Sequence, residues 1–310
     1  VEGARLERVG DAAQVRSVTF DGDHRAVLPS LNLAVDLNET SILRVAASRS
    51  ITRPSLADLR AATVPASVLV SAIYEDGEAA VTDPEDGLIF SGVGGNPALT
   101  PYVSTNVDVS YEVTGRRTSL SIAYFHKTID DFIETVAAPE VLTFETHAGP
   151  LVEAEVLMSR PHNVGRATID GVEFGLHQRL AYGLGLWASA TWTHSRLDGG
   201  GRLTGVSDWA WSLSPYLERG PFSVNLSWSW RSPFRSEADM QGGGVSDFTV
   251  GAAGYLDAQA VYQLPGQAEL VVAVTNLTDT RELAYEGSRD RLLQLGSVGR
   301  QASLGLRWVW

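Results

Sequence analysis

The sequence predicts an all-β fold, an antiparallel transmembrane β-barrel, and three observations lead to this prediction. Apolar and polar side chains alternate with a period of two along most of the 310 residues, so that each strand has one apolar and one polar face. Tryptophan recurs on the apolar face near the strand ends. Short and long connections between the strands alternate, as they do in outer-membrane barrels.

The last ten residues show the alternation most clearly. One side of this strand carries Ala302, Leu304, Leu306, Trp308 and Trp310, and the other side carries Gln301, Ser303, Gly305 and Arg307. A soluble sheet would bury the apolar side in a core. A barrel turns that side toward lipid and its polar side toward a wet interior.

The remaining strands follow from the same pattern. Clear alternation predicts strands at 30–37, 106–113, 208–217 and 222–231. Further strands are expected near 14–20, 41–52, 118–133, 166–180, 184–196, 254–264 and 267–277, which makes about twelve in all. The first dozen residues predict no clear element.

The connections fall into two classes. Tight turns are expected at Asn38-Glu39, 114–117, 181–183, Gly220-Pro221 and 265–267, where turn-forming residues occur. Long connections are expected at 54–102, 134–165, 197–207, 232–253 and 278–299. With the final strand ending in the periplasm, every short turn lies on the periplasmic side and every long loop on the extracellular side.

Composition excludes several classes of protein. Apolar runs are far shorter than the roughly 18 to 20 residues that a spanning helix needs. Cysteine is absent, which excludes disulfides and thiolate sites. The net charge of −13 and the scattered Lys and Arg argue against nucleic acid as a partner. Because nucleophile-elbow, phosphate-loop and dinucleotide motifs are missing, we expect no catalytic residue, no cofactor and no enzyme activity.

The polar face of the predicted strands carries ionisable and amide side chains that would look into the barrel. They are Asp36, Asp108, Glu112, Glu173, Arg179, Asn225, Arg231, Asp257, Gln259 and Arg307. Ionisable groups at membrane depth must face water or protein, so these residues could contact a plug or line a solute path. The alternative is a wetted interior that contacts nothing specific.

Three further sets of residues have two interpretations each. The acidic stretch from Glu75 to Asp86 could bind calcium, but it lacks EF-hand spacing, and a solvated loop explains it better. The six histidines show no metal-ligand spacing, and we assign no metal site. The tryptophans could stack on sugars, but an aromatic girdle at the lipid interface explains them better. This last set is Trp209, Trp211, Trp228, Trp230, Trp308 and Trp310.

Six short stretches, taken in their order, resemble the carboxy-terminal part of a TonB-dependent outer-membrane receptor. They are Leu28–Leu33, Ser48–Ser55, Gly95–Pro101, Tyr124–Lys127 with Asp130–Ile133, Ile169–Glu173 and Thr275–Asp279. The terminal Trp310, with Trp308, resembles the aromatic signal that the barrel-assembly machinery reads. The resemblance covers nearly the whole chain, so residues 1–310 are expected to be the carboxy-terminal portion of the barrel domain.

The resemblance implies a barrel of about 22 strands, filled by an amino-terminal plug that engages TonB. The plug is absent from this chain, whose start at Val1 we interpret as that of a fragment. Twelve strands alone would leave two edges unpaired in lipid, at a high cost in unsatisfied backbone groups. The remaining strands would come from another chain or from a lost portion of this one, unless the sheet closes as a smaller barrel.

The function that the resemblance implies is active import across the bacterial outer membrane. The cargo would be a scarce nutrient, with an oligosaccharide favoured and a siderophore chelate possible. Expected partners are the TonB complex, the barrel-assembly machinery, lipid and lipopolysaccharide, and the small ligand. The main alternative is a passive porin-like or adhesin barrel without energy coupling, and a weaker one is an outer-membrane enzyme.

Overall fold

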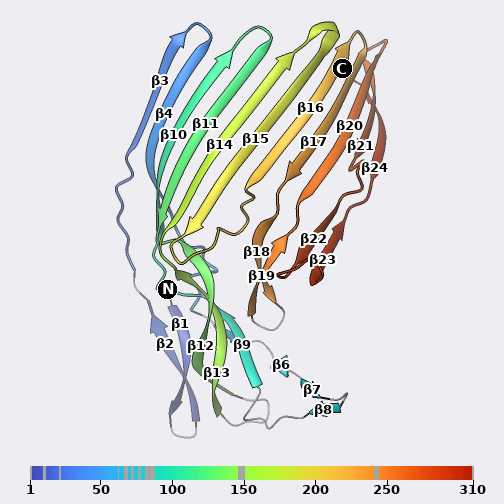
Figure 1. Ribbon diagram of the computed structural model, residues 1–310. Coiled ribbons are helices and arrows are strands. Elements are labelled where there is room, and N and C mark those ends of the chain that lie inside the picture. Colours follow the sequence, from blue (N-terminus) through green and yellow to red (C-terminus); the bar gives the residue numbers. More distant parts are fainter. Residues whose placement is uncertain are drawn as a thin grey trace.

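The computed structural model describes residues 2–9, 12–20, 22–61, 63–65, 69–70, 73–75, 78–80, 88–145, 151–240 and 244–308. Eleven strands lie side by side in one antiparallel sheet that forms a tall wall (Figure 1). From one edge to the other they are β3 (Ser30–Asn38), β4 (Ser41–Thr52), β10 (Tyr102–Thr114), β11 (Thr118–Asp130), β14 (Ala167–Arg179), β15 (Leu184–Leu197), β16 (Trp209–Arg219), β17 (Phe222–Arg231), β20 (Ala253–Leu264), β21 (Ala268–Thr275) and β24 (Gln301–Trp308).

The connections between these strands confirm the predicted alternation of short and long. Short turns lie at the upper end of the wall in Figure 1, and the long connections lie at the lower end. The turn between β14 and β15 is a single 3-10 segment, η1 (Ala181–Gly183), with positive φ at Tyr182 and Gly183. By the family pattern, the upper end is periplasmic and the lower end is extracellular.

The long connections contain strands of their own, which the sequence pattern did not predict. Three pairs form hairpins, namely β12 (Ile133–Glu145) with β13 (Leu151–Asn163), β18 (Phe234–Met240) with β19 (Gly244–Val250), and β22 (Arg281–Tyr285) with β23 (Leu292–Ser297). The connection after β4 contains β5 (Thr63–Pro65), β6 (Leu69–Val70), β7 (Ile73–Glu75), β8 (Glu78–Ala80) and β9 (Leu88–Gly94), and β9 pairs with β13 in parallel.

The predicted strand near 14–20 is the one that does not join the wall. It is β2 (Ala12–Thr19), which pairs with β1 (Glu2–Val9) as a separate hairpin at the extracellular end (Figure 1). The wall therefore has eleven strands and not about twelve. Alternation predicts a strand but not its partner, and here the preceding strand β1 supplies the hydrogen bonds.

The predicted strand 118–133 is interrupted at two residues, Asp131 and Phe132. Asp131 has φ of +59°, in the left-handed region that Asp tolerates better than most residues. β11 ends at Asp130 and β12 starts at Ile133, and the Phe132 backbone N–H donates to the Gly165 carbonyl. The break turns the chain from the wall into an extracellular hairpin.

The wall has two different faces. Directly paired residues share a face of the sheet. Followed strand by strand, the register places Leu304 on β24 and Leu31 on β3 on the same face. On this outward face the side chains are exposed, with Leu304 at 73% and Leu31 at 69%. Such a row of exposed apolar side chains is what a lipid-facing surface requires.

The buried hydrophobic cluster of the wall lies at its extracellular end. Ile129, Ala167, Leu197 and Leu203 form a cluster there. Among the described residues no helix is long and apolar enough to cross a membrane. Within the same residues, β3 and β24 each pair with one strand of the wall, so the sheet is not closed.

Candidate functional site

The register places all ten predicted interior residues on one face of the wall, opposite the lipid-facing side chains. This inward face is confirmed for Asp36, Asp108, Glu112, Glu173, Arg179, Asn225, Arg231, Asp257, Gln259 and Arg307. The structure does not gather them into one site. Asn225 and Gln259 are direct cross-strand partners, whereas Asp36 and Arg307 lie near opposite edges of the wall.

A cavity of about 350 Å³ opens on the inward face toward the extracellular end of β15, β16, β17 and β20. Its lining comprises Ser189, Thr191, Ala210, Ser212, Ser229, Arg231, Ala253 and Tyr255, together with Trp211 and Trp230, which the register assigns to the opposite face. Four of these residues carry an aliphatic hydroxyl, and the Ser189 and Ser212 hydroxyl oxygens are 2.8 Å apart. We call this the mouth cavity.

Arg231 is held firmly at the edge of the mouth cavity. Its Nη1 donates to the Gly251 carbonyl at 3.0 Å, and its Nη2 donates to Glu282 Oε1 at 3.0 Å. The guanidinium carbon lies 4.7 Å from the centroid of the Phe234 ring. The charge of Arg231 is therefore balanced by Glu282, and the last residue of β17 ties two extracellular connections to the wall.

A second inward cluster lies near the periplasmic end, and the sequence analysis missed it. The His177 ring stacks on Trp187, with centroids 3.7 Å apart and planes at 4°. His177 Nε2 is 2.8 Å from the Tyr216 hydroxyl. The sequence contained one signal for this cluster. Trp187 and Trp192 lie an odd number of residues apart on the same strand, so their side chains point to opposite faces of the sheet.

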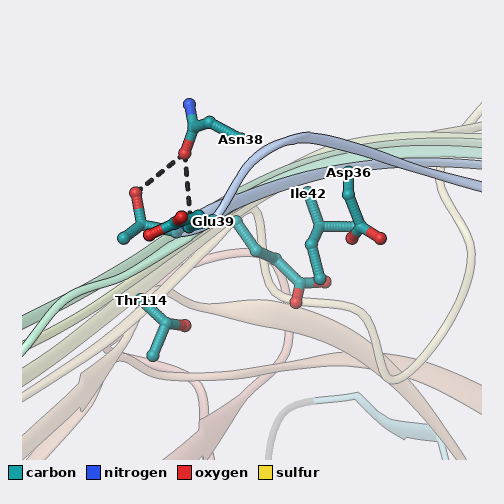
Figure 2. A pocket seen from close by; sticks show the side chains of 7 residues that line it. Asp36, Asn38, Glu39, Ile42 and Thr114 are labelled. Carbon is teal, nitrogen blue, oxygen red and sulfur yellow. Dashed lines mark hydrogen bonds between the residues drawn. The ribbon is translucent and has the colours of Figure 1, made fainter.

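Another cavity, of about 580 Å³, lies at the periplasmic rim between the β3–β4 turn and β10 (Figure 2). Asn38 Oδ1 accepts hydrogen bonds from the backbone N–H and the hydroxyl of Thr40, both at 2.9 Å, which fixes the turn. The lining includes Asp36, Glu39 and Glu112, and Arg44 pairs with Glu112 at 3.2 Å. This rim is acidic and faces the periplasm.

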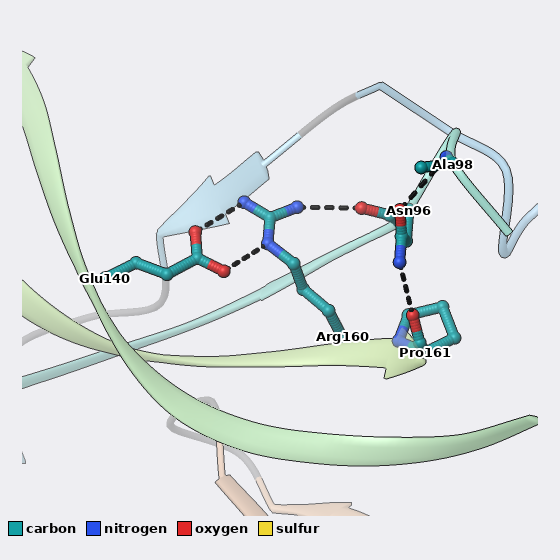
Figure 3. Close-up of polar contacts among 6 residues, drawn as sticks. Asn96, Ala98, Glu140, Arg160 and Pro161 are labelled. Carbon is teal, nitrogen blue, oxygen red and sulfur yellow. Dashed lines mark hydrogen bonds and ion pairs between the residues drawn. The ribbon is translucent and has the colours of Figure 1, made fainter. Parts of the chain in front are cut away.

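An arginine clamp holds the extracellular connections together (Figure 3). Arg160 on β13 donates to both carboxylate oxygens of Glu140 on β12, at 2.7 and 3.1 Å, and to the Gly95 carbonyl at 2.8 Å. Asn96 Nδ2 donates to the Pro161 carbonyl at 3.0 Å, and Asn96 Oδ1 accepts from the Ala98 backbone N–H. A bidentate ion pair of this kind is stronger than a single hydrogen bond, and it also restricts how the two side chains are oriented.

Five of the six tryptophans predicted to form a girdle lie on the outward face. The register places Trp209, Trp211, Trp228, Trp230 and Trp308 there. Trp310 lies outside the described residues, so its predicted role in barrel assembly stays a prediction. Trp211 and Trp228 meet edge to face, with centroids 5.2 Å apart.

In the described part of the chain, no group of three or more His, Asp and Glu side chains is placed to hold a metal ion. The side chains of the acidic stretch from Glu75 to Asp86 lie outside what the structure describes, so calcium binding there stays untested.

Comparisons with known proteins agree with this geometry. The ferric enterobactin receptor PfeA of Pseudomonas aeruginosa, solved as its R480A mutant with enterobactin, has a TM-score of 0.66 and 19% identity over 90% of this chain and 40% of that one. The siderophore receptor PirA of Acinetobacter baumannii gives 0.64 and 17% over 90% and 40%. The iron transporter FrpB of Neisseria meningitidis gives 0.57 and 14% over 96% and 39%.

This chain thus spans about 40% of the length of the solved receptors that it resembles. No curated protein matches it significantly. The family described as TonB dependent receptor-like, beta-barrel matches residues 3–277. The chain therefore belongs to the TonB-dependent receptor β-barrels of the bacterial outer membrane.

Proposed function

We propose that this chain forms part of an active importer, which takes up a small nutrient across the outer membrane with energy supplied through TonB. The observation that supports this most is the family match over residues 3–277, on a wall whose inward face is polar. The mouth cavity adds a place on the extracellular half of that face where cargo could first be held. TonB would act through a plug inside the barrel.

For the cargo we favour an oligosaccharide over a ferric siderophore. Hydroxyl groups dominate the polar lining of the mouth cavity, and Glu282 balances the charge of its one arginine. A strongly anionic iron chelate would be bound better by a lining with net positive charge. The siderophore receptors named above share less than 20% identity with this chain and therefore bear on its fold alone.

Growth of a deletion strain tests the function. The strain should fail to grow on limiting amounts of the transported oligosaccharide while still using ferric chelates, and loss of TonB should give the same defect. Uptake that continues without TonB would instead indicate the passive porin-like barrel. Loss of growth on a ferric chelate, with sugars unaffected, would reverse the cargo assignment but leave active import intact.

A pair of hydroxyl variants tests the mouth cavity itself. Removing Ser189 and Ser212 together (S189A with S212A) should raise the sugar concentration for half-maximal uptake about tenfold, because about two hydrogen bonds to cargo are lost. The matched control is S214A with S227A. These two hydroxyls also pair, at 3.2 Å, on the same face but outside the cavity, and uptake should stay unchanged.

A further inference from the structure

Three side chains on the outward face of β11 and β14 are arranged as a nucleophile, a base and an orienting carboxylate. His126 Nε2 is 3.0 Å from the Thr128 hydroxyl oxygen, and His126 Nδ1 is 2.7 Å from Asp170 Oδ1. Both distances lie within the reach that such groups need, about 2.6 to 3.2 Å. We call Thr128, His126 and Asp170 the outward triad. Because the three residues belong to two different strands, the search for local motifs did not find them.

The carboxylate of Asp170 determines which nitrogen of the imidazole carries the proton. An ionised carboxylate only accepts hydrogen bonds, so the His126 Nδ1 that faces Asp170 is the protonated nitrogen. Nε2 of the neutral ring then has a free lone pair directed at the Thr128 hydroxyl, which makes His126 a base for that hydroxyl. The Tyr124 hydroxyl also donates to Asp170 Oδ1, at 2.9 Å, and holds the carboxylate in place.

The outward triad is open to a substrate and has hydroxyl groups on both sides. The side chains of His126 and Asp170 are 38% and 34% exposed. Thr128 lies between Thr105 on β10 and Thr168 on β14, its direct cross-strand partners. Directly paired Cβ atoms are about 4.5 to 5.5 Å apart, so both hydroxyls are close enough to donate to an oxyanion that forms beside Thr128. Neither of these two hydroxyls has a hydrogen-bond partner among the residues that the structure describes.

The surroundings of the outward triad indicate the class of its substrate. On the periplasmic side of the triad the outward residues of both strands are aromatic or aliphatic, namely Tyr124, Ile122, Leu120, Val172, Phe174 and Leu176. On its extracellular side Asp130 and Arg166 form an ion pair at 2.7 Å. The outward face of these two strands therefore changes from apolar to polar at the triad. A membrane lipid has the same order, because its ester groups join the acyl chains to the polar headgroup.

We propose that the outward triad hydrolyses the acyl ester of a membrane lipid, an activity separate from import. Thr128 Oγ attacks the ester carbonyl carbon as its proton passes to His126 Nε2, and the hydroxyls of the two neighbouring threonines donate to the oxyanion. The bond to the alcohol oxygen then breaks, and that oxygen takes the proton from His126. Water gives a proton to His126 as it attacks the acyl-threonine ester. The fatty acid leaves, and the Thr128 oxygen takes that proton back.

Hydrolysis of a p-nitrophenyl fatty acyl ester by the receptor purified from outer membranes tests the activity. T128V removes the nucleophile with little change of shape and should lower kcat/KM at least about a hundredfold, whereas T128S should keep measurable hydrolysis. The matched control is T118V, on the same face at the periplasmic end of β11. The Thr118 hydroxyl donates to Gln178 at 2.7 Å, so the control also loses a hydrogen-bonded hydroxyl, but hydrolysis should stay unchanged. A heat-modifiable band on a gel shows that each variant is folded.

A fluorophosphonate probe identifies the nucleophile in the unchanged receptor. Peptide mass spectrometry should find the probe on the Thr128 hydroxyl, because the reaction needs a hydroxyl activated by a base. Asp170 acts through His126 and is a positioning residue. D170N should therefore lower kcat at least about a hundredfold with KM unchanged, and D170E should recover part of the loss.

Two lipids distinguish the possible sources of the ester. Vesicles of phosphatidylethanolamine and micelles of lipid A are assayed separately for released fatty acid, and release from either supports the proposal. Release from neither would overturn the lipid substrate. An unchanged receptor without hydrolysis, hydrolysis that is equal in T128V, or a probe attached to another residue would overturn the triad. Loss of TonB should leave hydrolysis unchanged, which separates this activity from import.

Discussion

At the scale of single residues, glycines on the inward face make room for aromatic rings on the next strand. Gly171 on β14 is the direct partner of Phe125 on β11, and a methyl group at position 171 would overlap the Phe125 ring. Gly185 on β15 is likewise the direct partner of Tyr216 on β16, and a methyl group at position 185 would overlap the Tyr216 ring. The ring covers the bare backbone of the glycine and shields its hydrogen bonds, as in aromatic rescue.

Replacing Gly171 by alanine should therefore destabilise the barrel. The Phe125 ring must leave its place, and overpacking of this kind costs roughly 1 to 3 kcal/mol. Urea unfolding of the purified receptor, followed by tryptophan fluorescence, measures the loss. Gly305→Ala on β24 is the control, because nothing lies within 4 Å of its added methyl group. Equal stability of the two variants would show that the ring moves away at no cost.

At the scale of elements, the short stretches that resemble the receptor family contact one another. Tyr124–Lys127 on β11 pairs residue by residue with Ile169–Val172 on β14. Ser30, within the first stretch, pairs with Ser48 in the second, and the Arg49 backbone N–H donates to the Pro29 carbonyl. The stretches that resemble the receptor family therefore lie on strands that pair with each other, or directly beside such strands.

Asn276, within the stretch Thr275–Asp279, anchors the last extracellular connection. It is 3% exposed, with φ of +53°. Its amide Nδ2 donates to the carbonyls of Thr280 and Gly299, and its Oδ1 accepts from the Thr280 backbone N–H at 2.8 Å. One side chain thus joins both ends of the connection between β21 and β24 and brings the chain back to the wall.

We expect Asn276→Ala to loosen this connection and to leave the wall intact. Two backbone carbonyls and one N–H lose their partner, at about 1 to 3 kcal/mol for each buried group left unsatisfied, and alanine is strained at positive φ. Limited proteolysis should cut between 278 and 299 several times faster. Asn225→Ala, an exposed inward amide in mid-strand, should leave the cleavage rate unchanged. Faster cleavage in both variants would point to a general loss of stability.

At the scale of the whole molecule, the wall ends in two strands with free hydrogen-bonding edges. Among the described residues β3 pairs only with β4, and β24 only with β21. Unpaired backbone groups cost several kcal/mol each in a bilayer. Both edges therefore need a hydrogen-bonding partner in the membrane, which is either further strands or the opposite edge of the same sheet.

Hydrogen exchange tests the closure of the barrel. In the receptor within outer-membrane vesicles, the amides of β3 and β24 should exchange as slowly as those of the interior strands β11 and β14, because every backbone group of a closed barrel is paired. The short connection 286–291, between β22 and β23, gives the fast reference. Exchange in β3 or β24 at the rate of that connection would mean that the edges stay open.

Period-two alternation was enough to predict the strands of the wall, their faces and the side of each turn. It predicted the strand near 14–20 but not that this strand pairs outside the wall, because a strand pattern does not name the partner strand. It also did not predict the hairpins within the long connections. It also missed the His177, Trp187 and Tyr216 cluster, whose members lie on three different strands.

The sequence by itself therefore determined which side chains face lipid and which face the interior, since alternation is a local property of extended chain. Only the tertiary structure decided which residues meet. Asp170 reaches His126 across 44 positions of sequence, and Arg231 reaches Glu282 across 51. The physical reason is that register, set by strand pairing and turn length, joins residues that no local pattern connects.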